Sequence, residues 1–142
     1  MQKIKELLFS LLLTAGLAGP TFAQAETIKL RADLNGSSEV PPNPSLATGT
    51  GEVTFDTVTK TLTWSISFTG LSGAAIGAHF HGPGETGRNA GIVLPFASAV
   101  SPITGSKAVS DMQAADILAG KWYINVHTER NPGGEIRGQL LK

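Results

Sequence analysis

"TLTWSISFT", residues 61–69, decides the fold class of this 142-residue chain. Apolar and small hydroxyl side chains alternate along the whole stretch. The apolar positions are Leu62, Trp64, Ile66 and Phe68. Successive side chains of a β-strand point to opposite faces, so the stretch predicts a strand with one buried and one solvated face. That division is typical of an antiparallel sheet.

Much of the remaining chain gives the same strand signal in shorter pieces. The further predicted strands are 27–34, 51–56, 76–81, 91–96, 121–128 and 135–141. Residues 57–60 fit a hairpin connection between two of them. Pro95 places its strand at an edge or a bulge, because proline cannot donate to a ladder. Three prolines between residues 35 and 51 predict a loop there.

One segment has a helical signal, "SDMQAADILAG" at residues 110–120. Ser110 and Gln113 have the spacing of a capping box, and Gly120 fits the end of the helix. There is no internal repeat and no sign of a second domain. Many short strands separated by turn residues predict an all-β fold, an antiparallel Greek-key β-sandwich or barrel of the immunoglobulin-like kind, with one short helix.

Residues 1–25 have the pattern of a secretory signal peptide. Two lysines come first, then a short apolar run, and then small residues at Ala23 and Ala25. We expect cleavage after Ala25, or else after Ala23, and a domain at 26–142 with no membrane span. The alternative is an uncleaved anchor helix, for which the apolar run is short. The sequence therefore predicts export, to the periplasm or the extracellular space.

Composition narrows the chemistry of the exported domain. The formal net charge is zero and no basic aromatic face is evident, so a nucleic-acid partner is not expected. The chain contains no cysteine, which removes thiolates as metal ligands or nucleophiles. No glycine-rich phosphate loop and no distinct Ser-His-Asp set can be identified.

The histidines are the most informative polar residues. The chain has only three, and two of them, His79 and His81, lie in "AHFHGPGETG" at 78–87. In a strand both point to one side, about 7 Å apart at Cα. In the strand at 121–128, His127 shares its outward face with Tyr123 and Asn125. Three neutral imidazoles suit copper or zinc. The alternative is that the histidines only order the loop at 82–91.

Four further polar residues are candidates around this site. Tyr123, Asn125 and Glu135 are candidate hydrogen-bond partners of metal ligands. Tyr123 and Asn125 could equally be ordinary polar residues of a strand face. Arg137 could form an exposed ion pair with Glu135, or place positive charge near the histidines and attract a small anion. We expect Glu39, within the proline-rich loop, to be a loop residue without a special role.

Three blocks carry a family resemblance: "SSEVPP" at 37–42, "FTGLSGAAIGAHFHGP" at 68–83 and "GKWYINVHTERNPGGEIRGQL" at 120–140. Together and in this order they resemble the CHRD domain, named after chordin, over roughly residues 27–141. The resemblance implies an extracytoplasmic β module, here as a secreted bacterial stand-alone form. In chordin such domains belong to a secreted protein that binds growth factors, so an extracellular protein partner is one expectation.

A second resemblance concerns only the histidines. His-x-His on one strand, a later histidine and a later Gly-x-Arg segment are similar to the copper site of Cu/Zn superoxide dismutases. By this resemblance His79, His81 and His127 would bind copper and Arg137 would guide an anion. The chain lacks that family's disulfide, an evident zinc loop and a fourth histidine. Three hypotheses remain: a copper or zinc binding domain, a metal-free adhesion or interaction module, and a dismutase-like copper enzyme.

Overall fold

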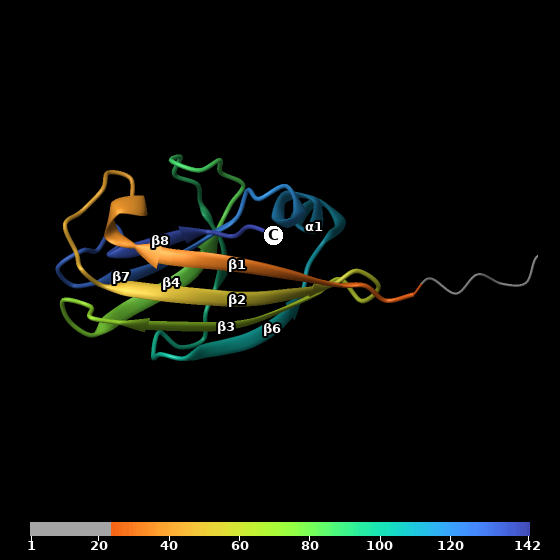
Figure 1. Cartoon of the computed structure of the whole chain (residues 1–142), viewed down its shortest axis with the longest axis horizontal. Coiled ribbons are helices and arrows are strands. Elements are labelled where there is room, and N and C mark those ends of the chain that lie inside the picture. Colours follow the sequence, from red (N-terminus) through yellow and green to blue (C-terminus); the bar gives the residue numbers. More distant parts are fainter. Residues whose placement is uncertain (1–23) are drawn as a thin grey trace, which may run out of the picture.

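The computed structural model describes residues 24–142. All but the last two residues of the expected signal peptide at 1–25 lie outside this range. Eight antiparallel strands, one short 3-10 helix and one α-helix make up the fold (Figure 1). The elements are β1 Thr27–Asn35, η1 Gly36–Ser38, β2 Thr48–Asp56, β3 Thr61–Thr69, β4 Ala75–His81, β5 Ile92–Pro95, β6 Ile103–Ala108, α1 Asp111–Leu118, β7 Tyr123–Thr128 and β8 Ile136–Gln139. This confirms the predicted all-β class with one short helix.

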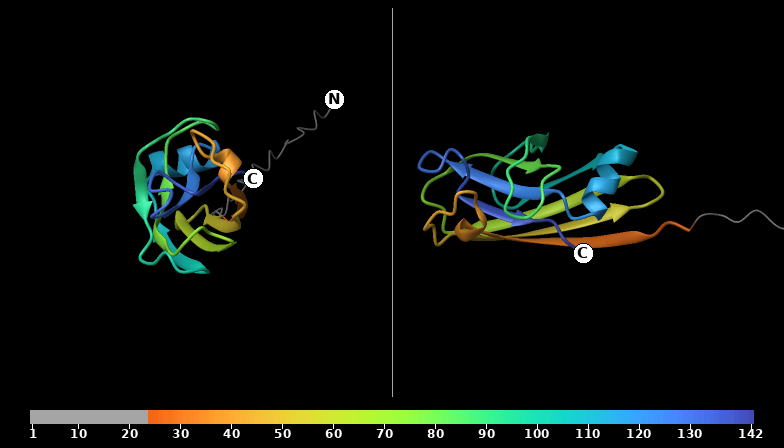
Figure 2. Two further views of the ribbon diagram at one scale, coloured as in Figure 1. Left: turned by 90° about the vertical axis from the view of Figure 1, so that its left-hand side faces the viewer. Right: turned by 90° about the horizontal axis from the view of Figure 1, so that it is seen from above.

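The eight strands form one continuous sheet that curls around its own core. Their order is β5-β4-β7-β8-β1-β2-β3-β6. The β1 and β8 strands share a single ladder pair, Asn35 with Arg137, so the sheet can bend sharply there. Figure 2 shows the resulting curled shape from two sides. Trp64 of β3 packs edge-on against Phe80 of β4, with ring centroids 5.5 Å apart, so the two halves of the sheet enclose one core as a β-sandwich.

The alternation in residues 61–69 is confirmed. Leu62 and Ile66 are fully buried, and Trp64 is 8% exposed. Phe68 at the end of the strand is only partly buried and packs against the same core. The hydroxyl residues between them face outward. Burial of such side chains is the main favourable term in folding, at about 25 cal/mol for each Å² of apolar surface.

The helix is also confirmed, together with its cap. The hydroxyl of Ser110 accepts from the Gln113 amide at 3.2 Å, and the Gln113 side chain accepts from the Ser110 amide at 3.0 Å. Gly120 has a φ of +71°, a conformation that glycine adopts without strain. Ala114 and Ile117 are buried against the core, so the helix covers one end of it.

One strand was missed by the sequence analysis. The β6 strand runs along β3, but its residues, ITGSKA, lack clean alternation. Gly105 of β6 pairs with Trp64, and a Cβ at this glycine would lie 2.5 Å from Trp64 Cζ2. The indole of β3 therefore needs a residue without a side chain opposite it. This requirement comes from tertiary packing and has no local signal.

Ile76 departs from the alternation of the strand predicted at 76–81. Strict alternation in 76–81 placed Ile76 inward together with Ala78 and Phe80, but Ile76 is 57% exposed. The ladder between β4 and β7 shifts register between Ala75 and Gly77, which turns the side chain outward. The parity of the strand beyond this irregularity is the predicted one.

The β7 strand is buried on both faces, in contrast to the outer strands. Its Tyr123 and Asn125 are each 3% exposed although they belong to the outward set. The loop after η1 and the loop after β4 lie over them. The Asn89 side chain of the second loop donates to the Val40 carbonyl of the first at 2.9 Å, and Asn125 donates to Glu39 of the first loop. A second layer of loops therefore covers this part of the sheet. Within residues 24–142 no helix is long and apolar enough to span a membrane.

Candidate metal centre

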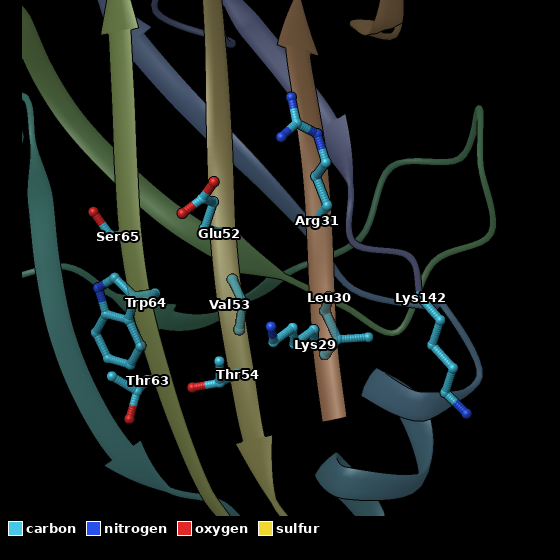
Figure 3. A pocket seen from close by; sticks show the side chains of 10 residues that line it. All are labelled: Lys29, Leu30, Arg31, Glu52, Val53, Thr54, Thr63, Trp64, Ser65 and Lys142. Atoms are coloured by element: carbon cyan, nitrogen blue, oxygen red, sulfur yellow. The ribbon is translucent and has the colours of Figure 1, made fainter. Parts of the chain in front are cut away.

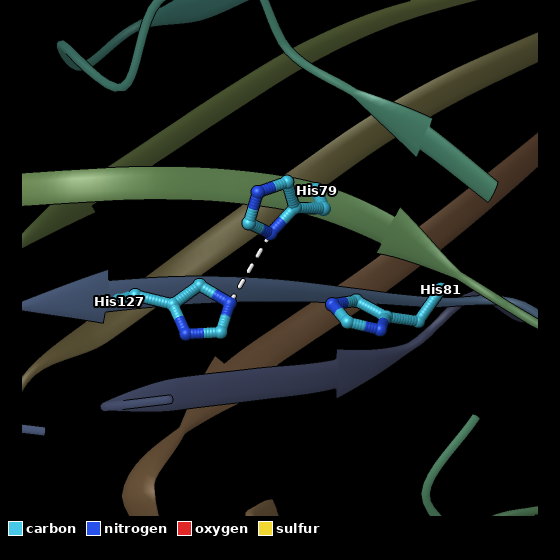
Figure 4. Close-up of side chains that lie close together, drawn as sticks. All are labelled: His79, His81 and His127. Atoms are coloured by element: carbon cyan, nitrogen blue, oxygen red, sulfur yellow. Dashed lines mark hydrogen bonds between the residues drawn. The ribbon is translucent and has the colours of Figure 1, made fainter. Parts of the chain in front are cut away.

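The three histidines converge on the outer face of two paired strands. His79 and His81 come from β4 and His127 from β7, and the ladder pairs Gly77 with His127 and His79 with Asn125. One ring nitrogen from each histidine lies within 4.8 Å of the other two. Figure 4 shows the rings of His79 and His127 in hydrogen-bond contact and the ring of His81 beside them. The predicted common side for all three imidazoles is confirmed.

Hydrogen bonds to carbonyl groups determine which nitrogens are available. Nδ1 of His81 donates to the Ala90 carbonyl at 2.9 Å, and Nδ1 of His127 donates to the Pro132 carbonyl at 2.9 Å. A carbonyl oxygen only accepts, so in each neutral ring Nε2 keeps the lone pair. Nε2 of His81 is buried and has no hydrogen-bond partner in the described structure. A metal ion would satisfy this atom.

The closest pair of ring nitrogens has the spacing of two ligands of one ion. Nδ1 of His79 lies 3.2 Å from Nε2 of His127. Bonds of about 2.0–2.1 Å in a tetrahedral zinc site place two nitrogens about 3.3 Å apart. The ring centroid of His81 lies 5.6 Å from that of His79 and 6.2 Å from that of His127. The His81 ring nevertheless presents a nitrogen within 4.8 Å of one nitrogen on each of the other two rings.

The surroundings favour neutral imidazoles. Burial lowers the pKa of His79 below its ordinary 6.5, and the neighbouring rings of His127 and His81 lower it further. Burial also lowers the pKa of His81, although the hydrogen bond to Ala90 opposes the shift. Only a neutral imidazole has a lone pair for a metal, so both rings remain competent ligands at neutral pH.

Behind the histidines, a tyrosine joins His81 to a buried arginine. The rings of His81 and Tyr123 are stacked, with centroids 4.9 Å apart and an interplanar angle of 6°. Cζ of Arg137 lies 3.5 Å from the centroid of Tyr123. Because β7 lies between β4 and β8, the aromatic ring has the imidazole on one side and the guanidinium on the other. The Tyr123 hydroxyl accepts from the Ala90 amide at 2.9 Å, which fixes the loop that holds His81.

The expected ion pair of Arg137 with Glu135 is not formed. Arg137 is 2% exposed, and it donates to the Asn89 side chain at 3.0 Å and to the Arg88 carbonyl at 2.7 Å. The Glu135 carboxylate instead accepts from Ser45, Ser72 and Thr128. Thr128 belongs to the core-facing set of β7, so Glu135 lies on the other side of the strand from His127. Regular alternation in the strand predicted at 135–141 would place Glu135 on the same face as Arg137. Glu135 does not follow it because it precedes β8 and is not part of the regular ladder.

The comparisons with known proteins give one result. The CHRD domain family matches residues 30–140, which include all three histidines. The chain belongs to the CHRD family. Against curated proteins and solved structures the search gives no significant match. The family resemblance drawn from the three sequence blocks is thereby confirmed.

One buried residue of this CHRD domain was missed as a candidate. Glu39 is 6% exposed and accepts from the Asn125 side chain at 2.5 Å. Burial raises its pKa to about 7, although the charge of Arg137 and the bond from Asn125 act in the opposite direction. Glu39 follows η1 in a loop without periodicity. No local pattern could show that this loop folds back over β7.

Two hollows of the CHRD domain differ in whether a histidine lines them. One of about 590 Å³ lies against β1, β2 and β3, and Figure 3 shows its lining side chains, among them Lys29, Glu52 and Trp64. None of the three histidines lines it. A smaller cavity of about 170 Å³ is lined by His81, Tyr123, Asn125 and Glu39, among others. Of the three candidate metal ligands, only His81 lines this smaller cavity together with the buried Glu39.

Proposed function

We propose that this CHRD domain binds one copper or zinc ion through His79, His81 and His127. The observation that carries the proposal is the convergence of one nitrogen from each ring within 4.8 Å. Two of the rings are held by carbonyl groups in the tautomer that leaves Nε2 free. The chain has no thiolate, and imidazole suits zinc and copper.

The ligand atoms in this proposal are Nδ1 of His79 and Nε2 of His81 and His127. The bonds from His81 to Ala90 and from His127 to Pro132 orient two of the rings, a role that such outer contacts have in many metal sites. Asn125 and Tyr123 pack around the site, whereas Glu135 bonds elsewhere. A bound copper or zinc ion with three protein ligands supplies an open coordination position for water or a small exogenous ligand.

Titration of the purified, metal-stripped protein tests the proposal. We expect uptake of about one Cu(II) or Zn(II) per chain, lost in His81→Ala and in His127→Ala. Thr63→Ala, on the outer face of β3, is the matched control and should bind as the wild type does. Uptake that is absent, or that survives both histidine variants, would contradict the proposal and favour the metal-free interaction module.

An enzyme hypothesis has weaker support from the geometry. An anion guide should face the opening through which the anion reaches the metal, but Arg137 lines a cleft that none of the three histidines lines, and the ring of Tyr123 lies between Arg137 and His81. The copper-loaded protein should therefore consume superoxide no faster than an equal concentration of free copper. Faster consumption that falls in Arg137→Gln would instead support the enzyme.

We also propose export of the domain, on the basis of the lysines, the apolar run and the small residues at 23 and 25. Amino-terminal sequencing of the protein secreted by its host checks this. A chain that begins at Glu26 or at Gln24 is expected. A chain that keeps its initial methionine contradicts it.

A further inference from the structure

A second cleft lies beside the candidate metal centre, between two loops and β8. Its volume is about 460 Å³, within the range of about 300–1,000 Å³ that small-molecule sites occupy. One wall comes from residues 37–40 and Pro42, and another from Thr86 and Gly87. Figure 1 shows η1 and the loop that follows β4 on the same side of the sheet, near β8. None of the three histidines lines this cleft.

Two buried side chains of opposite charge line the cleft. Arg137 is 2% exposed and Glu39 is 6% exposed, and both are among its lining residues. The hydroxyl residues Ser37, Ser38 and Thr86 contribute to the walls. Charged groups that are nine-tenths buried are rare unless they are paired, so each needs a partner.

The two charges do not pair with one another. Among the ion pairs of residues 24–142 there is none between Glu39 and Arg137, so their closest nitrogen and oxygen atoms are more than 4.0 Å apart. Arg137 donates to one amide oxygen and one carbonyl, both neutral. Glu39 accepts at Oε1 from the neutral amide of Asn125. The structure thus keeps a guanidinium and a carboxyl group on the lining of one cleft with no direct ion pair between them, although the charge of Arg137 is near enough to lower the pKa of Glu39.

We expect a ligand with a single charge to bind weakly between these two side chains. An anion next to Arg137 would be repelled by Glu39, and a cation next to Glu39 would be repelled by Arg137. A ligand that carries both charges would satisfy both groups at once. Its carboxylate would accept from the guanidinium, and its ammonium would donate to Oε2 of Glu39, for which residues 24–142 provide no hydrogen-bond donor.

We propose that the cleft between η1, the loop after β4 and β8 binds a small zwitterion, an amino acid carrying a free ammonium and a free carboxylate. Glu39 binds the ammonium and Arg137 binds the carboxylate. The hydroxyls of the two loops provide the remaining polar contacts. None of the three histidines lines this cleft, and its occupancy does not require a metal.

Nuclear magnetic resonance titration of the metal-stripped protein tests this. The probes are glycine, β-alanine and γ-aminobutyrate, three zwitterions of increasing charge separation, with acetate and ethylamine as single-charge analogues. Removal of metal matters because amino acids themselves chelate copper. We expect at least one zwitterion to give saturable shifts in the amides of residues 37–40 and 86–87. Its dissociation constant should be at least tenfold below those of acetate and ethylamine.

Two variants examine the assigned roles. Glu39→Gln and Arg137→Gln should each weaken binding of the preferred zwitterion at least tenfold. Glu85→Gln, an exposed carboxylate on the loop after β4, is the matched control and should leave binding unchanged. If Arg137→Gln does not fold, Glu39→Gln decides alone.

Three results would overturn the proposal. They are the absence of saturable shifts with every zwitterion, equal affinity for acetate or ethylamine, and unchanged affinity in Glu39→Gln. The first would leave a water-filled cleft whose charges are separately solvated. Each of these is read in the absence of metal, so none depends on whether the histidines bind an ion.

Discussion

Nδ1 of His79 lies 3.2 Å from Nε2 of His127, although 48 residues separate them in the chain. The contact exists because β4 and β7 pair antiparallel with Gly77 opposite His127. In the metal-free protein one nitrogen must donate to the other. His127 already donates through Nδ1 to Pro132, so His79 is the donor when both rings are neutral. An ion between them replaces this bond.

The affinity of the site for metal should depend on pH mainly below the range in which an ordinary histidine side chain titrates. Burial holds the pKa values of His79 and His81 below 6.5, so both rings stay mainly neutral as the pH falls from 8 to about 7. We expect the affinity for Zn(II) to stay nearly level over this interval and to fall at lower pH, as protons compete for the nitrogens. Competition titrations with a chelator across pH 5–8 measure this. A steep decline already between pH 8 and 7 would contradict the assigned environment.

Glu39 should destabilise the fold at alkaline pH. Its pKa is raised from 4.5 to about 7, so the unfolded carboxyl ionises first and the folded state becomes less stable as the pH rises between these values. The shift corresponds to about 3 kcal/mol in the free energy of unfolding. Glu39→Gln, which keeps the acceptor for Asn125, should therefore gain about 1–3 kcal/mol at pH 8 and little at pH 4. Urea denaturation at both pH values compares them, and equal effects at both would speak against a buried ionising group.

The ionised carboxylate of Glu135 should stabilise the fold, in contrast to that of Glu39. Burial alone would raise its pKa, but hydrogen bonds from Thr128, Ser72 and Ser45 hold the pKa at about 2. The unfolded carboxyl binds protons more readily, so the stabilisation is complete above pH 4.5 and is lost as the pH falls towards 2. Glu135→Gln removes the charge and presents an amide to donors, and should cost about 2–4 kcal/mol at pH 7. Thermal unfolding measures the loss, which should shrink near pH 3; a loss that is the same at both pH values would refute it.

Adjacent glycines offer a matched pair of substitutions. Gly134 has a φ of +130°, and a Cβ there would lie 2.4 Å from Asn125 Nδ2 and 2.5 Å from Glu39 Oε1. Gly134→Ala should therefore destabilise the protein by about 2–4 kcal/mol. A Cβ at Gly133 would meet nothing within 4 Å, so Gly133→Ala should change stability by less than about 0.5 kcal/mol. Denaturant unfolding ranks the two, and similar losses would mean that the contact between Gly134 and Glu39 is not tight.

The sequence was sufficient where a property follows the local period of the chain. Alternation placed Leu62, Trp64 and Ile66 in the core, and the capping box placed the start of α1. The same parity rule brought His79, His81 and His127 to one face, because the ladder between β4 and β7 is regular from Gly77 to His81. These features need no knowledge of distant contacts.

The sequence was insufficient where tertiary packing decides. Ile76 faces outward because of an irregular ladder, and Gly105 matters only because Trp64 lies opposite it. Glu39 was predicted to be a plain loop residue and Glu135 to be a partner of the metal ligands, yet both are buried. Glu39 lies against Asn125, and Glu135 accepts from Ser45, Ser72 and Thr128. The contacts of Glu39 with Asn125 span 86 positions, and no local pattern encodes such a separation. Loops that cover a polar sheet face create buried polar sites that periodicity cannot predict.

Calorimetric titration of the metal-stripped wild type and His81→Ala with Zn(II) and Cu(II) at pH 7.5 tests the central proposal most directly. Three converging imidazoles predict one ion per wild-type chain and at least a hundredfold weaker binding in His81→Ala, since its unpartnered Nε2 is the ligand removed. Equal uptake by both proteins, or none by either, would contradict a metal centre at these histidines.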